Sequence, residues 1–98
     1  MKIIWSPLAV DQVRDIVAYI ALDKPTVAVQ WAEKIFNAVE LLLEYPESGR
    51  VVPEIKRTEI RELVQGSYRV IYKITPGSIL VLVVKSYRQQ LNKNEIKV

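Results

Sequence analysis

Three arginines carry the chemistry that this sequence offers most clearly. Arg61, Arg69 and Arg88 fall in or beside three apolar runs that we expect to form neighbouring strands of one small sheet. A guanidinium group donates parallel hydrogen bonds that phosphates and carboxylates accept. Arginines held on one rigid sheet face therefore predict a preorganised anion site, although the same residues also suit a solvated strand surface.

The composition excludes several classes of function. The chain has 98 residues and contains neither cysteine nor histidine, which rules out disulfides, Cys- or His-based zinc sites and a histidine general base. We expect no metal and no cofactor. The longest apolar run, residues 79–84, is much shorter than the roughly 20 residues of a membrane span, and the first residues lack a secretory signal. We therefore expect a cytoplasmic protein.

The charge is unevenly distributed along the chain. Residues 1–50 carry five basic and seven acidic side chains, a net charge of −2, whereas residues 51–98 carry nine basic and four acidic ones, a net charge of +5. The positive potential of the second half suits an anionic partner, either a nucleic acid or an acidic protein segment. A basic surface that serves solubility alone is the alternative.

The first half of the sequence predicts a strand and two helices. Residues 2–5 are branched or aromatic, and Ser6-Pro7 then supplies an N-cap and a proline suited to the first helical turn. Apolar residues at helical spacing extend this helix to about Ala21. A second helix is expected to begin at Asp23-Lys24-Pro25, with Asp23 as its cap, and to end before the turn-forming residues 45–49. The short connection predicts an antiparallel helical hairpin.

The second half predicts a three-stranded antiparallel meander. Residues 60–65, 68–74 and 79–84 have strand patterns and are joined by turns at 65–67 and 75–78. Residues 49–54 are expected to form a loop or an edge segment because of their proline. The predicted fold is a single α+β domain over residues 1–98, in the order β-α-α-β-β-β, with the hairpin packed on a small, mainly antiparallel sheet. For the C-terminal tail, residues 89–98, a helix, a strand paired with a partner and a free tail all stay open.

This order of elements resembles the RelE/ParE superfamily of type II toxin–antitoxin toxins. Several motifs resemble its ParE branch in particular, and together they extend from about Ile3 to Arg88. They are Trp5-Ser6-Pro7 with Ala9, Tyr19-Ile20, residues 46–50 (Pro-Glu-Ser-Gly-Arg), Val52-Pro53-Glu54, Arg61-Glu62-Leu63, residues 68–72 (Tyr-Arg-Val-Ile-Tyr) and Arg88.

The resemblance implies a small toxin that a cognate antitoxin neutralises by wrapping its C-terminal segment around the toxin. ParE-type members inhibit DNA gyrase and block replication, and RelE-type members cut mRNA on the ribosome without a metal. We expect gyrase inhibition, with the arginine-bearing sheet and the basic segment 93–97 as candidate contacts. Sequence-specific DNA binding by the toxin alone is not expected, because the helices belong to the more acidic half.

The ribonuclease alternative requires groups that deprotonate the 2′-hydroxyl, stabilise the phosphate and protonate the leaving oxygen. Arg61, Arg69, Arg88 and Tyr87 are its weak candidates. Where RelE-type toxins have lysines, this sequence has Ile60 and Glu62, and no tyrosine is found near residue 94. A third reading is a chain without toxicity that is retained as a binding partner in autorepression.

The antitoxin is expected to bind in two ways, as an amphipathic helix in a groove beside the hairpin and as a strand added to an open sheet edge. Simple core packing is the alternative for the apolar candidates. The predicted antitoxin contacts are Val13, Val17, Phe36, Val39 and Leu43, with Arg61 and Arg69 facing acidic antitoxin side chains.

Overall fold

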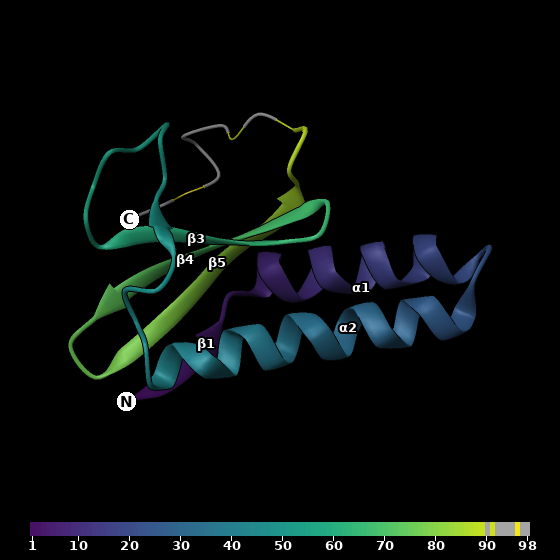
Figure 1. Ribbon diagram of the computed structural model, residues 1–98, viewed down its shortest axis with the longest axis horizontal. Helices are drawn as coiled ribbons and strands as arrows, with labels where there is room; N and C mark the ends of the chain where they lie inside the picture. The colour runs from purple at the N-terminus through teal and green to yellow at the C-terminus, as the bar shows by residue number, and fades with distance from the viewer. Residues whose placement is uncertain (90, 92–95, 97–98) are drawn as a thin grey trace.

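The computed structural model describes residues 1–89, 91 and 96. A helical hairpin follows the first strand, and a meander completes the chain (Figure 1). The elements are β1 (Lys2–Trp5), α1 (Pro7–Ala21), α2 (Pro25–Glu40), the 3-10 helix η1 (Leu41–Leu43), β2 (Arg50–Val51), β3 (Ile60–Gln65), β4 (Tyr68–Thr75) and β5 (Ser78–Ser86).

The two helices begin differently. Ser6 caps α1, since its side-chain oxygen accepts a hydrogen bond from the Ala9 amide at 3.0 Å, as its position before Pro7 predicts. The predicted capping of α2 by Asp23 is wrong, because Lys24 occupies the N-cap position and makes no side-chain capping bond. The Asp23 amide instead donates to the carbonyl of Ile20, so Asp23 still belongs to the last turn of α1.

The sheet has five strands in the order β1-β5-β4-β3-β2. The meander β3-β4-β5 is antiparallel, with two-residue connections whose glycines, Gly66 and Gly77, have positive φ values of 60° and 85°. β1 pairs in parallel with β5, so that Trp5 lies opposite Val81. β2 is a short edge strand beside β3, which agrees with the expectation of a loop or edge segment over residues 49–54.

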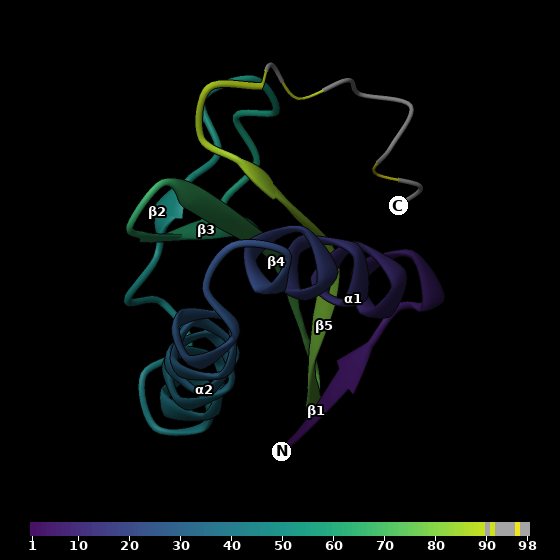
Figure 2. The same ribbon diagram turned by 90° about the vertical axis from the view of Figure 1, so that its right-hand side faces the viewer.

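The sheet is covered on both faces. Figure 2 shows α1 and α2 on one side of the twisted sheet and the loop between β2 and β3 on the other. We call these the helix face and the outer face. The principal core lies under the helices and contains Ala9, Val13, Ile35, Val39, Val70, Val81 and Val84. A second apolar cluster on the outer face contains Val52, Ile60, Ile71, Val83, Leu91 and Ile96.

These observations confirm the predicted α+β fold class and the predicted order of elements, to which the structure adds the short edge strand β2. Residues 90, 92–95 and 97–98 lie outside the described residues, as does most of the basic segment 93–97 that was predicted to contact gyrase. Leu91 and Ile96 are described, and both are buried in the cluster on the outer face. In the described part of the chain, no helix is long and apolar enough to cross a membrane.

Candidate functional site

The three arginines do not share a face of the sheet. Arg61 lies opposite Tyr72 in the β3–β4 register, and Tyr72 belongs to the core on the helix face. Arg69 neighbours Ile71 at the alternate position of β4 and therefore points to the outer face. Arg88 follows β5 in an exposed turn. The expectation of one arginine-bearing face is wrong. In the register between β3 and β4, Arg61 and Arg69 occupy positions whose side chains point to opposite faces of the sheet.

Arg69 is buried and bound to two carboxylates. Its side chain is only 5 % exposed. Its Nε donates to Glu62 Oε1 at 2.6 Å, and its two terminal nitrogens donate to the oxygens of Glu54 at 2.8 and 3.0 Å. The hydrogen bonds to Arg69 lower the pKa of Glu54 to about 2, and those same bonds raise the pKa of Arg69. A phosphate at Arg69 would have to compete with a bidentate carboxylate that is already in place.

Glu62 extends these contacts to a second arginine. Its other oxygen, Oε2, accepts from the Nε of Arg50 at 2.6 Å, and the Glu62 side chain is completely buried. Arg50 and Glu62 lie directly opposite each other in β2 and β3, which explains their contact. The result is a continuous chain of alternating charges on the outer face, which we call the arginine–glutamate chain: Arg50, Glu62, Arg69 and Glu54.

The exposed end of the arginine–glutamate chain is formed by Arg50 and Tyr87. The hydrogen bond to Glu62 is the main cause of the raised pKa of Arg50, and Tyr87 makes a smaller contribution in the same direction. The Arg50 side chain is 54 % exposed, and Tyr87 is 48 % exposed. Sequence reasoning missed Arg50 and Glu54 as partners because both lie in the segment that was interpreted only as a loop or an edge. The sequence signal that could have found them is the opposite charge of their partners, Glu62 in β3 and Arg69 in β4.

Arg61 has a different environment, in which it holds a loop. Its Nε donates to the Thr58 carbonyl at 3.0 Å, and its Nη1 donates to the carbonyls of Gly49 and Glu47 at 3.0 and 3.4 Å. Nearby, the Tyr72 hydroxyl donates to the Pro46 carbonyl at 2.7 Å. Arg61 therefore makes backbone contacts between β3 and the segment that leads from η1 to β2.

The predicted antitoxin contacts are only partly brought together. Val13 and Val39 are buried in the core, and Val17 packs against it, whereas Phe36 and Leu43 are 47 % and 39 % exposed. An apolar cavity of about 220 Å³, which we call the Trp5–Phe36 groove, lies between β1 and the helices. The rings of Trp5 and Phe36 meet edge to face there, with their centroids 5.2 Å apart. The residues that line the groove are Trp5, Val10, Val13 and Phe36.

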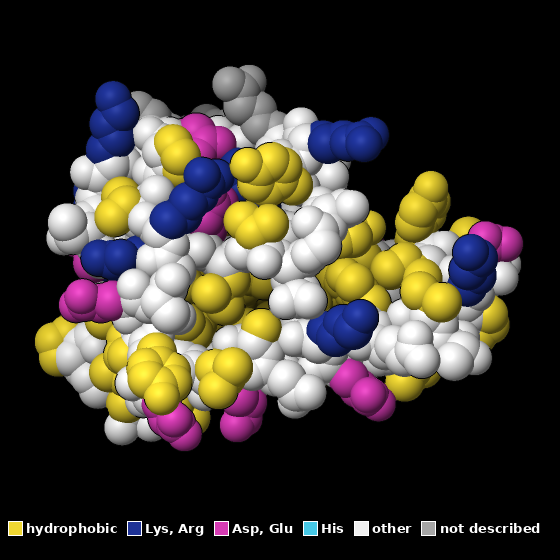
Figure 3. All heavy atoms as spheres, viewed as in Figure 1, with side chains coloured by type: hydrophobic (Ala, Val, Ile, Leu, Met, Phe, Trp, Pro, Cys, Tyr) yellow, Lys and Arg dark blue, Asp and Glu magenta, His cyan; other side chains and the backbone are white. Residues whose placement is uncertain are grey.

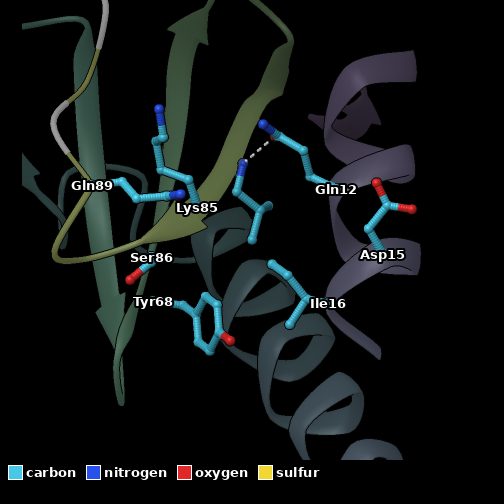
Figure 4. Close-up of a pocket in the computed structure, with 8 residues that line it drawn as sticks. Gln12, Asp15, Ile16, Tyr68, Lys85, Ser86 and Gln89 are labelled. Carbon is cyan, nitrogen blue, oxygen red and sulfur yellow. Dashed lines mark hydrogen bonds between the residues drawn. The ribbon is translucent and has the colours of Figure 1, made fainter. Parts of the chain in front are cut away.

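A second cavity, of about 480 Å³, lies between α1 and the end of β5 (Figure 4). β1 pairs with β5 only as far as Val81, so beyond that residue β5 has β4 on one side and no strand on the other. The Val84 amide instead donates to Oε1 of Gln12 at 2.8 Å, which is the dashed contact in the figure. Asp15 and Tyr68 also line this cavity. A side chain from α1 thus satisfies a backbone group at an open sheet edge.

Within residues 1–89, 91 and 96, no group of three or more His, Cys, Asp or Glu side chains is placed to hold a metal ion. Glu54 and Glu62, which share Arg69, bind arginines. The described site therefore consists of charged and aromatic side chains.

Comparisons with known proteins identify relatives of this chain. Residues 3–91 match the family described as the ParE toxin of the type II toxin–antitoxin system parDE. A protein named "Putative toxin Y4kP" from Sinorhizobium fredii is 33 % identical over 88 residues, which cover 90 % of this chain and 91 % of that relative.

Among solved structures, the fold is similar to a chain from the chromosomal ParDE toxin–antitoxin system of P. aeruginosa, with a TM-score of 0.74. The match covers 88 % of this chain and 95 % of that one, at 17 % identity, and it supports the fold. The family match spans nearly all of the described strands and helices. The chain therefore belongs to the ParE family of toxins of type II toxin–antitoxin systems.

Proposed function

We propose that this protein is the toxin of a toxin–antitoxin pair, that it inhibits DNA gyrase by binding, and that a cognate antitoxin neutralises it. The observation that carries the proposal is the match of residues 3–91 to the ParE toxin family. Gyrase and its DNA lie in the cytoplasm, where such a toxin would act.

The arginine–glutamate chain supports binding rather than RNA cleavage. Metal-free cleavage needs a group that accepts a proton, and Glu62 is the carboxylate that the sequence offers at the corresponding strand. Both of its oxygens accept from arginines at 2.6 Å, and the side chain is fully buried. The Tyr72 hydroxyl is also buried and bonded to the loop, and burial raises its pKa. A binding inhibitor needs neither group to exchange protons.

The Trp5–Phe36 groove is the part of the surface that suits an antitoxin helix. Its walls are aromatic and aliphatic, and Phe36 is nearly half exposed in the described chain. An amphipathic helix that inserted apolar side chains beside Phe36 would cover this ring and the neighbouring Val10. The solved ParDE system with the same fold also pairs a toxin with an antitoxin. Arg61 and Arg69 are less available to an acidic antitoxin segment, because carbonyl or carboxylate groups already bind them.

The first experiment is a supercoiling and cleavage assay with purified toxin, gyrase, relaxed plasmid and ATP. Loss of supercoiling, or linear plasmid, that the antitoxin reverses is the expected result. A ribosome–mRNA cleavage reaction run in parallel tests the RelE-type alternative. Cut mRNA with unaffected gyrase would overturn the proposal, and silence in both reactions would favour a non-toxic partner in autorepression.

The antitoxin surface is tested separately by Phe36→Asp, which places a charge in the groove. We expect the variant to remain folded, because Phe36 is 47 % exposed, and to lose antitoxin binding. Val29→Asp, at a 57 % exposed position of the same helix, is the matched control. Equal antitoxin affinity of the two variants would place the antitoxin elsewhere.

A further inference from the structure

We propose that the outer face at Arg50 and Tyr87 binds single-stranded nucleic acid, with the guanidinium group on a phosphate and the phenol ring under an unpaired base. This inference goes beyond gyrase inhibition, because it concerns the toxin's own contact with a nucleic acid. The two residues come from β2 and from the turn after β5, and they interact with each other.

Arg50 is bound by Glu62 at one nitrogen, interacts with Tyr87 and stays partly exposed. Its Nε is bound by Glu62 at 2.6 Å, which fixes the plane of the guanidinium group, while 54 % of the side chain stays exposed. Planar, preoriented guanidinium groups suit phosphate because the donors already have the required geometry. The hydrogen bond to Glu62 raises the pKa of Arg50 and so favours its charged form.

The acidic partners on this face are not presented to the ligand. Glu62 is buried, and both oxygens of Glu54 are bound to Arg69. Glu59 forms an ion pair with Arg57. Glu54, Glu59 and Glu62 therefore each have a cationic partner, which compensates their negative charge.

Tyr87 supplies the second element of recognition. Its backbone amide donates to the Ser67 carbonyl at 2.7 Å, which anchors the residue to the β3–β4 turn, while 48 % of the residue is exposed. A half-exposed aromatic ring beside an arginine is the combination that stacks a base and binds the adjoining phosphate. Val64, opposite Arg69, is 49 % exposed and adds apolar surface to the same face.

Charge complementarity favours a polyanion at this face. The helical half of the sequence is net negative and the sheet half is net positive. In Figure 3, most of the Lys and Arg side chains lie over the sheet half, where some Asp and Glu side chains also appear, and further Asp and Glu side chains lie along the lower rim. Exposed Arg88 directly follows Tyr87 and adds to the positive potential.

The ligand is single-stranded because a base must be unpaired to lie on Tyr87. Duplex DNA would offer phosphates to Arg50 but no base face, and neither helix lies on this side of the sheet to enter a groove. An acidic peptide would also engage Arg50 but would leave the tyrosine ring unused. DNA and RNA share the chemistry required here, and the experiment separates them.

The experiment measures fluorescence anisotropy of labelled 12-nucleotide oligothymidylate and oligouridylate, and of a duplex of the same length, with the full-length purified toxin. We expect both single strands to bind more tightly than the duplex. One phosphate contact, at Arg50, predicts that affinity falls about two- to threefold between 50 and 200 mM salt. Equal binding of the two single strands indicates recognition of base and phosphate alone, and preference for oligouridylate indicates that the 2′-hydroxyl is also read.

Tyr87→Leu keeps an apolar side chain and removes the ring, so we expect at least a tenfold loss of affinity. Tyr19→Leu is the matched control, because Tyr19 is a 73 % exposed tyrosine on α1, away from the outer face. Arg50→Gln is expected to weaken binding and to reduce the salt dependence. Because that change also affects a buried contact, Arg88→Gln, at an exposed position, is measured as a second test of the charge.

Absence of oligonucleotide binding at 50 mM salt would overturn the inference, as would equal affinity of the Tyr87 and Tyr19 variants or tighter binding of the duplex. Binding of a polyglutamate peptide that competes with the oligonucleotides and is unaffected by Tyr87→Leu would assign the face to an acidic protein instead. Gyrase inhibition by the unmodified toxin is assayed separately. Inhibited gyrase without oligonucleotide binding would reject this inference and leave the proposed function standing.

Discussion

Gly49 lies directly against the side chain of Tyr72. Its amide donates to the Tyr72 hydroxyl oxygen at 3.0 Å, and a β-carbon added to Gly49 would lie 2.6 Å from that oxygen and 2.6 Å from the Glu62 carbonyl. Both residues are buried. The segment leading to β2 can therefore approach the sheet only with glycine at this position.

Gly49→Ala is expected to destabilise the protein by about 2–3 kcal/mol, because the new methyl group displaces a fully buried ring and a strand carbonyl. Urea unfolding checks the prediction. Ser48→Ala, at the exposed neighbouring position, should leave the unfolding midpoint nearly unchanged. A wild-type midpoint for Gly49→Ala would show that the loop moves away without cost.

Tyr72→Phe removes the hydroxyl that joins two loop groups. The Gly49 amide and the Pro46 carbonyl would both lose a partner in a buried setting, so we expect a loss of about 1–3 kcal/mol. Thermal or urea unfolding measures this effect. Tyr19→Phe, on the surface of α1, provides the comparison for loss of an exposed hydroxyl. Equal stability of the two variants would mean that water replaces the missing contact.

Glu62→Gln removes the charge that joins Arg50 and Arg69. Arg69 is buried, so loss of one of its two carboxylate partners is expected to cost about 3–5 kcal/mol. Glu59→Gln disturbs an exposed ion pair with Arg57 and should have a much smaller effect. Comparison of the two unfolding curves tests whether the arginine–glutamate chain stabilises the outer face.

The pH dependence of stability should report Glu54. Its pKa in the folded protein is about 2, below the value of 4.5 for the free side chain, because Arg69 favours the carboxylate. A lowered folded pKa contributes stability above the unfolded pKa, and that contribution is lost as the pH falls from about 4.5 towards 2. We expect a loss of about 1–2 kcal/mol over this range, given the partial exposure of Glu54. Glu54→Gln should flatten the stability profile between these pH values, and an unchanged slope would contradict the assignment.

Leu91 covers part of the apolar cluster on the outer face. It is 5 % exposed and packs with Val52, Ile60, Ile71 and Val83, and its amide contacts Glu54 Oε2 at 3.4 Å. Leu91→Ala should cost about 2–4 kcal/mol through lost apolar burial. Leu22→Ala, where the side chain is 86 % exposed, should cost almost nothing. Similar unfolding midpoints for the two variants would show that Leu91 adds little to this cluster.

The helices and the meander were predictable because their signals are local. Ser6-Pro7 caps and starts α1, and the turn residues at 66 and 77 define the lengths of the antiparallel strands. The parallel pairing of β1 with β5 was not predicted, because it depends on where the hairpin returns the chain. No local pattern at residues 2–5 specifies that partner.

The site was less predictable than the fold, for a related reason. The positions of Arg61, Arg69 and Arg88 in or beside strands were visible in the sequence, but the faces of Arg61 and Arg69 depend on the register between β3 and β4. The partners of Arg69 depend on the path of the loop that brings Glu54 over the sheet. Sequence patterns give the period of a strand and leave such register and loop paths open.

The pairing of β1 with β5 also governs when the protein can fold. Lys2 lies opposite Ser78 and Trp5 opposite Val81, so one seam of the sheet joins residues about 76 positions apart in the sequence. Contacts so distant in sequence close late and slow the folding reaction. A nascent chain that has not yet presented residues 78–86 lacks the strand on which both β1 and β4 pair. During synthesis, the toxin fold can therefore form only after most of the polypeptide has been made.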